Sequence, residues 1–69
     1  MRMGTITLNG KPHSIENRVA LVELLNSIGV DRRLIAVAHN GEVIPRDRYE
    51  GVRLSEGDTV EVVRMVGGG

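Results

Sequence analysis

The sequence predicts an α+β domain in which one small mixed sheet carries a single helix on one face. Two Asn-Gly pairs, at 9–10 and 40–41, each divide short segments in which apolar residues recur, a pattern that indicates β-hairpins. One apolar stripe with helical spacing lies between the two pairs. A final alternating segment begins at residue 59. With 69 residues the chain is long enough for one domain with a small hydrophobic core.

The first hairpin begins with residues 5–9, where Ile6 and Leu8 alternate with polar residues as in a half-buried strand. Asn9-Gly10 is the strongest short-range hairpin signal, because both residues tolerate the positive φ of a type I′ turn. We therefore expect a second strand over residues 11–15 to return alongside the first.

The pattern changes period over residues 19–28, where the apolar side chains recur at the spacing of one helical face. These side chains are Leu21, Leu24, Leu25 and Ile28. We expect Asn17 to cap the N-terminus of this single helix, and Gly29 to end it in the left-handed conformation.

A second hairpin is expected after the helix. Residues 34–39 predict a third strand, and Asn40-Gly41 predicts the turn into a short Val43-Ile44 strand. Pro45 interrupts that strand, because proline has no N–H to donate to a sheet.

Residues 46–54 are expected to be mostly irregular, and a turn at residues 56–58 leads into the last strand, residues 59–66. The order ββαβ(β)β, with one helix over one face of a mixed sheet, is the β-grasp arrangement. Alternation along the third and last strands assigns four side chains to its core, namely Ile35, Val37, Val60 and Val62.

The other face of this sheet has no second layer to cover it. The opposite parity of the same two strands places Ala36, Ala38, Val63 and Met65 on that face, as a small apolar patch beside the C-terminal glycines. Apolar patches of this kind mark docking surfaces. We therefore predict that these four residues dock a partner.

Composition narrows the possible functions. Tyr49 is the only aromatic residue, so an aliphatic core is expected. Nine basic and nine acidic side chains cancel, which gives no electrostatic reason to expect nucleic acid or an anionic membrane as a direct partner. No segment approaches the ~20 apolar residues of a membrane span, and no signal peptide is evident, so a cytoplasmic protein is expected.

Side chains typical of catalysis or metal binding form no motif. The chain has no cysteine, which excludes a disulfide framework, a thiolate metal site and a cysteine nucleophile. His13 and His39 are far apart in the sequence, so an exposed or sheet-edge position is expected for each, and no metal site is predicted. No acidic pair or Ser-His-Asp set has the spacing of an enzyme, so no catalytic residue is predicted.

The terminal glycines, Gly67, Gly68 and Gly69, are the most informative feature of the sequence. Without Cβ atoms they adopt almost any backbone conformation and pass where other residues clash. Three extended residues reach roughly 10 Å, which suffices to place a terminal carboxylate in the active site of another protein. We expect a β-grasp domain over residues 1–66 and a flexible tail over residues 67–69, with the Gly69 carboxylate as the reacting group.

The segment IAVAHNGEVIPR (residues 35–46), with Tyr49, the Gly57-Asp58 turn and the terminal glycines, resembles the β-grasp sulfur carrier proteins, specifically the thiamine-biosynthesis sulfur carriers. The resemblance covers nearly the whole chain. It carries over Gly68 and Gly69 as the functional Gly-Gly pair. Gly67 lengthens the tail by one residue, and Tyr49 stands where tryptophan is common.

The resemblance implies a protein co-substrate without a bound cofactor. An E1-like adenylyltransferase would use ATP to convert the Gly69 carboxylate into an acyl-adenylate. Sulfur from a donor such as a cysteine desulfurase system would then displace AMP, leaving a thiocarboxylate. Gly67 and Gly68 would thread the partner's tunnel, and thiazole synthase would take up the sulfur for thiamine. A monomer is expected.

Two other classes of function fit the same sequence. The first is a sulfur carrier with another acceptor, either in molybdopterin synthesis or in the thiolation of transfer RNA. The second is a ubiquitin-like modifier, whose Gly69 would form an isopeptide bond with a lysine of a target protein, or a plain interaction module without chemistry.

Overall fold

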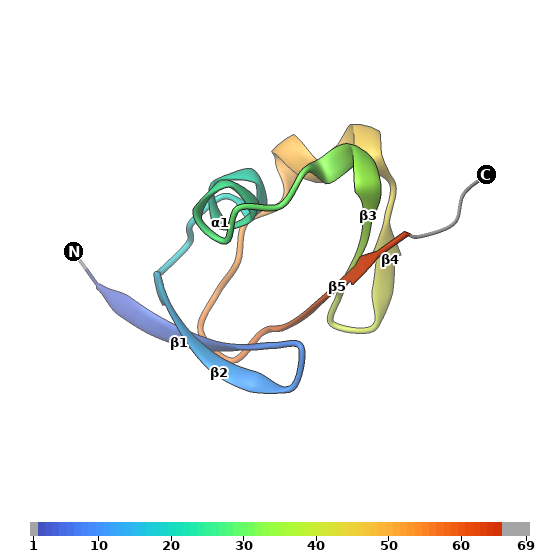
Figure 1. The fold of residues 1–69 in the computed structure, drawn as a ribbon. Helices are drawn as coiled ribbons and strands as arrows, with labels where there is room; N and C mark the ends of the chain where they lie inside the picture. Colours follow the sequence, from blue (N-terminus) through green and yellow to red (C-terminus); the bar gives the residue numbers. More distant parts are fainter. Residues whose placement is uncertain (1, 66–69) are drawn as a thin grey trace.

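The computed structural model describes residues 2–65. Five strands form one sheet in the order β2-β1-β5-β3-β4, and helix α1 (Leu21–Ser27) packs on one face of it (Figure 1). Two short 3₁₀ helices, η1 (Arg32–Leu34) and η2 (Arg46–Gly51), precede β3 and follow β4. The β-grasp prediction is confirmed.

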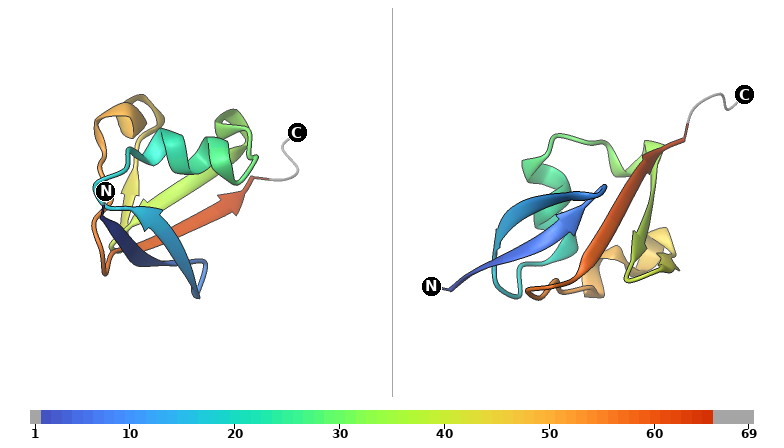
Figure 2. Two further views of the ribbon diagram at one scale, coloured as in Figure 1. Left: turned by 90° about the vertical axis from the view of Figure 1, so that its left-hand side faces the viewer. Right: turned by 90° about the horizontal axis from the view of Figure 1, so that it is seen from below.

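The mixed sheet places the last strand at its centre. The strands are β1 (Met3–Leu8), β2 (Lys11–Glu16), β3 (Ile35–His39), β4 (Glu42–Ile44) and β5 (Thr59–Arg64). Strand β5 pairs antiparallel with β3 and parallel with β1, while β2 and β4 form the outer edges. Figure 2 shows β5 running between the two hairpins toward the C-terminal end of the chain.

Both predicted Asn-Gly turns are confirmed. Asn9 and Gly10 have φ angles of 51° and 82°, and Asn40 and Gly41 have 52° and 85°. Positive φ at both central residues defines the type I′ turn, whose twist matches that of the flanking strands. The two turns therefore fix the pairing of β1 with β2 and of β3 with β4.

The prediction that Asn17 caps the helix is wrong. Helix α1 begins after Ala20, which has no side-chain capping bond. The backbone at its start is held instead by a distant segment, since the N–H of Leu21 donates to the carbonyl of Val52 at 2.9 Å. The side chain of Asn17 accepts a hydrogen bond from the N–H of Glu56. Long-range pairing thus sets where the helix begins.

The predicted end of the helix is confirmed at Gly29, although the helix itself stops at Ser27. Gly29 has a φ of 76°. Its N–H donates to the carbonyl of Asn26, and the N–H of Val30 donates to the carbonyl of Leu25. These two hydrogen bonds form the Schellman motif that satisfies the last carbonyls of a helix.

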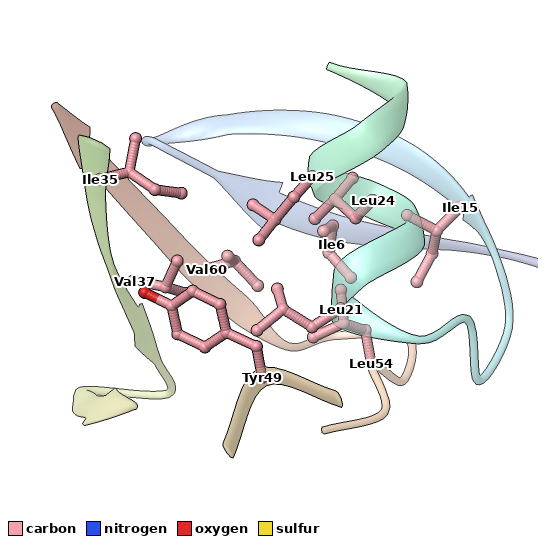
Figure 3. Close-up of a cluster of buried hydrophobic side chains, with 10 residues drawn as sticks. All are labelled: Ile6, Ile15, Leu21, Leu24, Leu25, Ile35, Val37, Tyr49, Leu54 and Val60. Atoms are coloured by element: carbon pink, nitrogen blue, oxygen red, sulfur yellow. The ribbon is translucent and has the colours of Figure 1, made fainter. Parts of the chain in front are cut away.

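The hydrophobic core lies between α1 and the sheet (Figure 3). Ile35, Val37 and Val60 are buried as predicted, and Val62 is half-buried and packs against the cluster. The prediction of a purely aliphatic core is wrong, because Tyr49 is only 2% exposed. Residues 46–51 are also not irregular: they form η2, which carries Tyr49 into the core.

A polar network holds the start of β5. His39 is not an exposed histidine: its side chain is 20% exposed, and its Nε2 lies 2.8 Å from Oδ2 of Asp58. Asp58 also accepts hydrogen bonds from the N–H of Ser55 and from Nδ2 of Asn40. Burial opposes ionisation of Asp58, but these hydrogen bonds outweigh it and hold the pKa of that carboxyl below its usual value.

Candidate functional site

The backbone of β5 is tied to the sheet up to the last described residue. The N–H of Met65 donates to the carbonyl of Leu34 at 2.8 Å, directly before β3. Residues 66–69 lie outside the described part of the chain. The reacting group at Gly69 and the threading role of Gly67 and Gly68 therefore stay predictions.

The residues before β3 form a local hydrogen-bonded network next to the Met65–Leu34 contact. Asp31 caps η1 by accepting a hydrogen bond from the N–H of Arg33, and both of its carboxylate oxygens contact the Arg33 guanidinium, at 3.1 and 2.9 Å. These hydrogen bonds lower the pKa of Asp31 from 3.8 to about 2, so the pair stays charged at neutral pH. The guanidinium of Arg46 also donates to the carbonyl of Arg33. Leu34, whose carbonyl accepts the hydrogen bond from Met65, follows directly.

The four residues predicted for docking come together on the face opposite α1. The register of β3 and β5 pairs Ala36 with Val63. Val63 is 60% exposed and Met65 is 56% exposed, whereas Ala36 and Ala38 are half-buried. The right view of Figure 2, from below, shows this face of the sheet, with β5 in front and α1 behind the sheet. The patch therefore exists, and its role in docking stays a prediction.

Two further apolar residues on this face were missed by the sequence reasoning. Val43, which pairs with Ala38, is 72% exposed, and Leu34, beside Met65, is 54% exposed. The two-residue turn at Asn40-Gly41 fixes the pairing of β3 with β4. Alternation of side chains along β4 would therefore have predicted that Val43 lies on this face. We call the six residues together the apolar strip: Leu34, Ala36, Ala38, Val43, Val63 and Met65.

One charged side chain interrupts the apolar strip. Glu61 lies opposite Ala38 in the register and is exposed. Across residues 2–65 no group of three or more histidine, cysteine, aspartate or glutamate side chains could hold a metal ion. In the same part of the chain no helix has the length and apolar character needed to cross a bilayer. The apolar strip with Glu61 is thus the exposed surface that lies closest along the chain to the predicted tail.

Comparison with known proteins supports a single family. The chain matches the ThiS family over residues 6–69. It is 34% identical over 65 residues to the sulfur carrier protein ThiS of Bacillus subtilis, a match that covers 93% of this chain and 98% of the relative. It also superposes on the crystal structure of the thiamine biosynthesis protein (ThiS) from Geobacter metallireducens with a TM-score of 0.82. That match has 32% sequence identity and covers 94% of this chain and 99% of the other.

A second kind of relative is much longer than this chain. This chain is 42% identical over 64 residues to the thiazole synthase of Magnetococcus marinus, and the match covers 93% of this chain but 20% of that protein. The chain spans about a fifth of the length of the thiazole synthases that it matches. Those relatives therefore join a segment similar to this chain to a larger remainder in one polypeptide.

Proposed function

The chain belongs to the ThiS family, and from this membership we propose that it is a sulfur carrier for thiamine biosynthesis. The observation that carries the proposal is the extent of the family match, which runs to Gly69 and so includes the terminal glycines. In this role the protein is a co-substrate rather than a catalyst, and the reacting group is its own α-carboxylate.

The carboxylate requires activation, because a free carboxylate is a poor acyl donor. An E1-like adenylyltransferase joins it to the α-phosphate of ATP, and pyrophosphate leaves. The terminal sulfur of a persulfide, formed by a donor such as a cysteine desulfurase, then attacks the acyl carbon and AMP leaves. A thiol cleaves the resulting sulfur–sulfur bond, and the thiocarboxylate remains. The proposed location of these steps is the cytoplasm, where ATP is available.

The proposed sulfur acceptor is thiazole synthase. This choice rests on the long relatives, in which a carrier-like segment and a thiazole synthase share one polypeptide. No comparable observation favours molybdopterin synthase or an enzyme of transfer-RNA thiolation. Thiazole synthase is therefore preferred over these alternatives.

The apolar strip is the proposed docking surface for these partners. A protein that holds the Gly69 carboxylate in its active site also lies over the strand that leads to the tail, and Val63 and Met65 are the exposed apolar residues of that strand. A few residues in the well-packed centre of an interface carry most of its binding energy. Docking at the apolar strip thus brings the tail and the partner's site together.

Isotope exchange between ATP and pyrophosphate tests the proposal. The chain should support exchange by the adenylyltransferase of its own organism, because formation of the acyl-adenylate is reversible. A chain with one residue added after Gly69 keeps the domain intact and serves as the matched control. Exchange with the extended chain would contradict the assignment of Gly69, and covalent conjugates with other proteins would favour a ubiquitin-like modifier instead.

A further inference from the structure

Strand β5 continues past the end of its parallel neighbour. Strand β1 pairs with β5 only at Thr7–Thr59 and Leu8–Val60. The turn residue Asn9 then completes the contact: its N–H donates to the carbonyl of Val60, and its Oδ1 accepts from the N–H of Val62 at 2.8 Å. The side chain of Asn9 therefore ends the pairing, and the right-hand view of Figure 2 shows β5 extending beyond the β1–β2 turn.

Beyond this point the side of β5 that faces β1 pairs with no strand in the part of the chain that the structure describes. Backbone N–H and C=O groups point to opposite sides of a strand at alternate residues. The N–H of Met65 points toward β3, where it donates to Leu34, so the N–H and C=O of Arg64 point toward the β1 side. Among residues 2–65 no strand continues there. We call the C=O of Val62 and the N–H and C=O of Arg64 the free edge.

The free edge differs from the two outer edges of the sheet. Exposed strand edges are commonly protected by proline or by short length, because they otherwise recruit another strand. Strand β2 contains Pro12, and the three-residue β4 is followed directly by Pro45. Residues 62–65 contain no proline, and they lead directly to the four residues at the C-terminus. The free edge is thus an edge without proline that leads along the chain to the predicted reacting group.

We infer that the free edge pairs with an extended backbone segment of thiazole synthase, which adds a short strand to the sheet where the tail enters that enzyme. This inference rests on the proposed function. Strand addition supplies main-chain hydrogen bonds that do not depend on the partner's side chains. It also holds Arg64 and Met65 extended at the point where the sheet ends. A synthase joined to a carrier-like segment is the partner that the long relatives favour.

Two substitutions at one position test the inference. Arg64→Ala removes the side chain and keeps the N–H, whereas Arg64→Pro removes both. The N–H of Arg64 donates to no group within residues 2–65, so proline at this edge position costs no sheet hydrogen bond. We expect Arg64→Pro to bind the thiazole synthase of the same organism about tenfold more weakly than Arg64→Ala, the effect of losing one main-chain hydrogen bond. Equal affinities would overturn the inference.

Amide exchange of the isotope-labelled chain supplies a second readout. In the free protein the Arg64 amide should exchange quickly, and the Met65 amide, bonded to Leu34, should exchange slowly. Binding of the synthase should slow exchange at Arg64. If Arg64→Pro lowers the denaturation midpoint, a backbone ester at residue 64 removes the same N–H without the proline ring and replaces that variant.

The outcomes separate this inference from the proposed function. Binding of the synthase with unchanged exchange at Arg64 overturns strand addition and leaves the sulfur carrier intact. Absence of any binding overturns both the acceptor and strand addition. A third outcome is that the chain self-associates with rising concentration, that Arg64→Pro abolishes this self-association, and that Arg64→Pro and Arg64→Ala bind the synthase equally. This outcome would assign the free edge to a second copy of this chain and overturn the inference.

Discussion

Replacement of Met65 by alanine separates docking from stability. The Met65 side chain is 56% exposed, so folding removes less than half of its surface from water. Full burial of a methionine contributes about 1.5–3 kcal/mol, so the partial burial of Met65 contributes about 1 kcal/mol at most to the free energy of unfolding. A central contact of an interface contributes on the order of 1–2 kcal/mol, which is about 5–30-fold in Kd. Met65→Ala should therefore lower the free energy of unfolding by about 1 kcal/mol at most, and weaken partner binding by about 1–2 kcal/mol.

The chain offers a matched control in Met3, which is 66% exposed on β1. Thr7 pairs with Thr59 in the parallel strands, so Met3 and Met65 lie toward opposite ends of the sheet. Chemical denaturation and calorimetric titration with the adenylyltransferase measure both effects. Met3→Ala should change neither quantity by much. A loss of roughly 2–5 kcal/mol of stability in Met65→Ala, the range for a buried methionine, would refute the docking assignment, as would unchanged binding.

Three further predictions concern the fold and the tail. Asp58→Asn should cost on the order of 1–2 kcal/mol of stability at neutral pH. The folded-state pKa of Asp58 lies below its unfolded value, so the stability that the Asp58 carboxylate contributes is present above about pH 4 and is lost as pH falls through the folded pKa. The urea midpoints of the two proteins should therefore converge in acid. A difference that stays constant with pH would contradict the lowered pKa of Asp58. Gly29→Ala should destabilise by about 1 kcal/mol, because φ is positive while the space for a Cβ is open, and Gly29→Asn should cost less; equal midpoints would argue against the left-handed cap. In relaxation measurements the order parameter of the Gly68 amide should be well below that of Val60, since glycines bury too little surface to offset the entropy of ordering; equal values would count against a free tail.

Local chemistry predicted the turns and the helix end, because those features depend on neighbouring residues. Asn9-Gly10 and Gly29 adopt the expected positive φ angles. The start of the helix could not be predicted in this way. It depends on the hydrogen bond between Leu21 and Val52, residues that are distant in the sequence and that no periodicity connects.

The same distinction explains the errors in the core. Tyr49 lies in a segment without alternation, so its burial depends on η2 and on contact with other elements rather than on any pattern of its own. Alternation along β3 places the His39 side chain on the core side, with Ile35 and Val37. Its partner Asp58 could not be predicted from the sequence, because the two residues meet only when β5 lies beside β3. Parity did place Val63 and Met65 on the exposed face, because alternation is local to a strand.

The central claim is that the Gly69 carboxylate carries sulfur. Its most direct test is the intact mass of the chain after incubation with the adenylyltransferase, ATP, a cysteine desulfurase and cysteine. We expect the mass to rise by the difference between one sulfur atom and one oxygen atom, with the change confined to the C-terminal peptide. The chain extended by one residue after Gly69 should keep its original mass. An unchanged mass of the natural chain, or a sulfur atom located elsewhere than Gly69, would contradict the account.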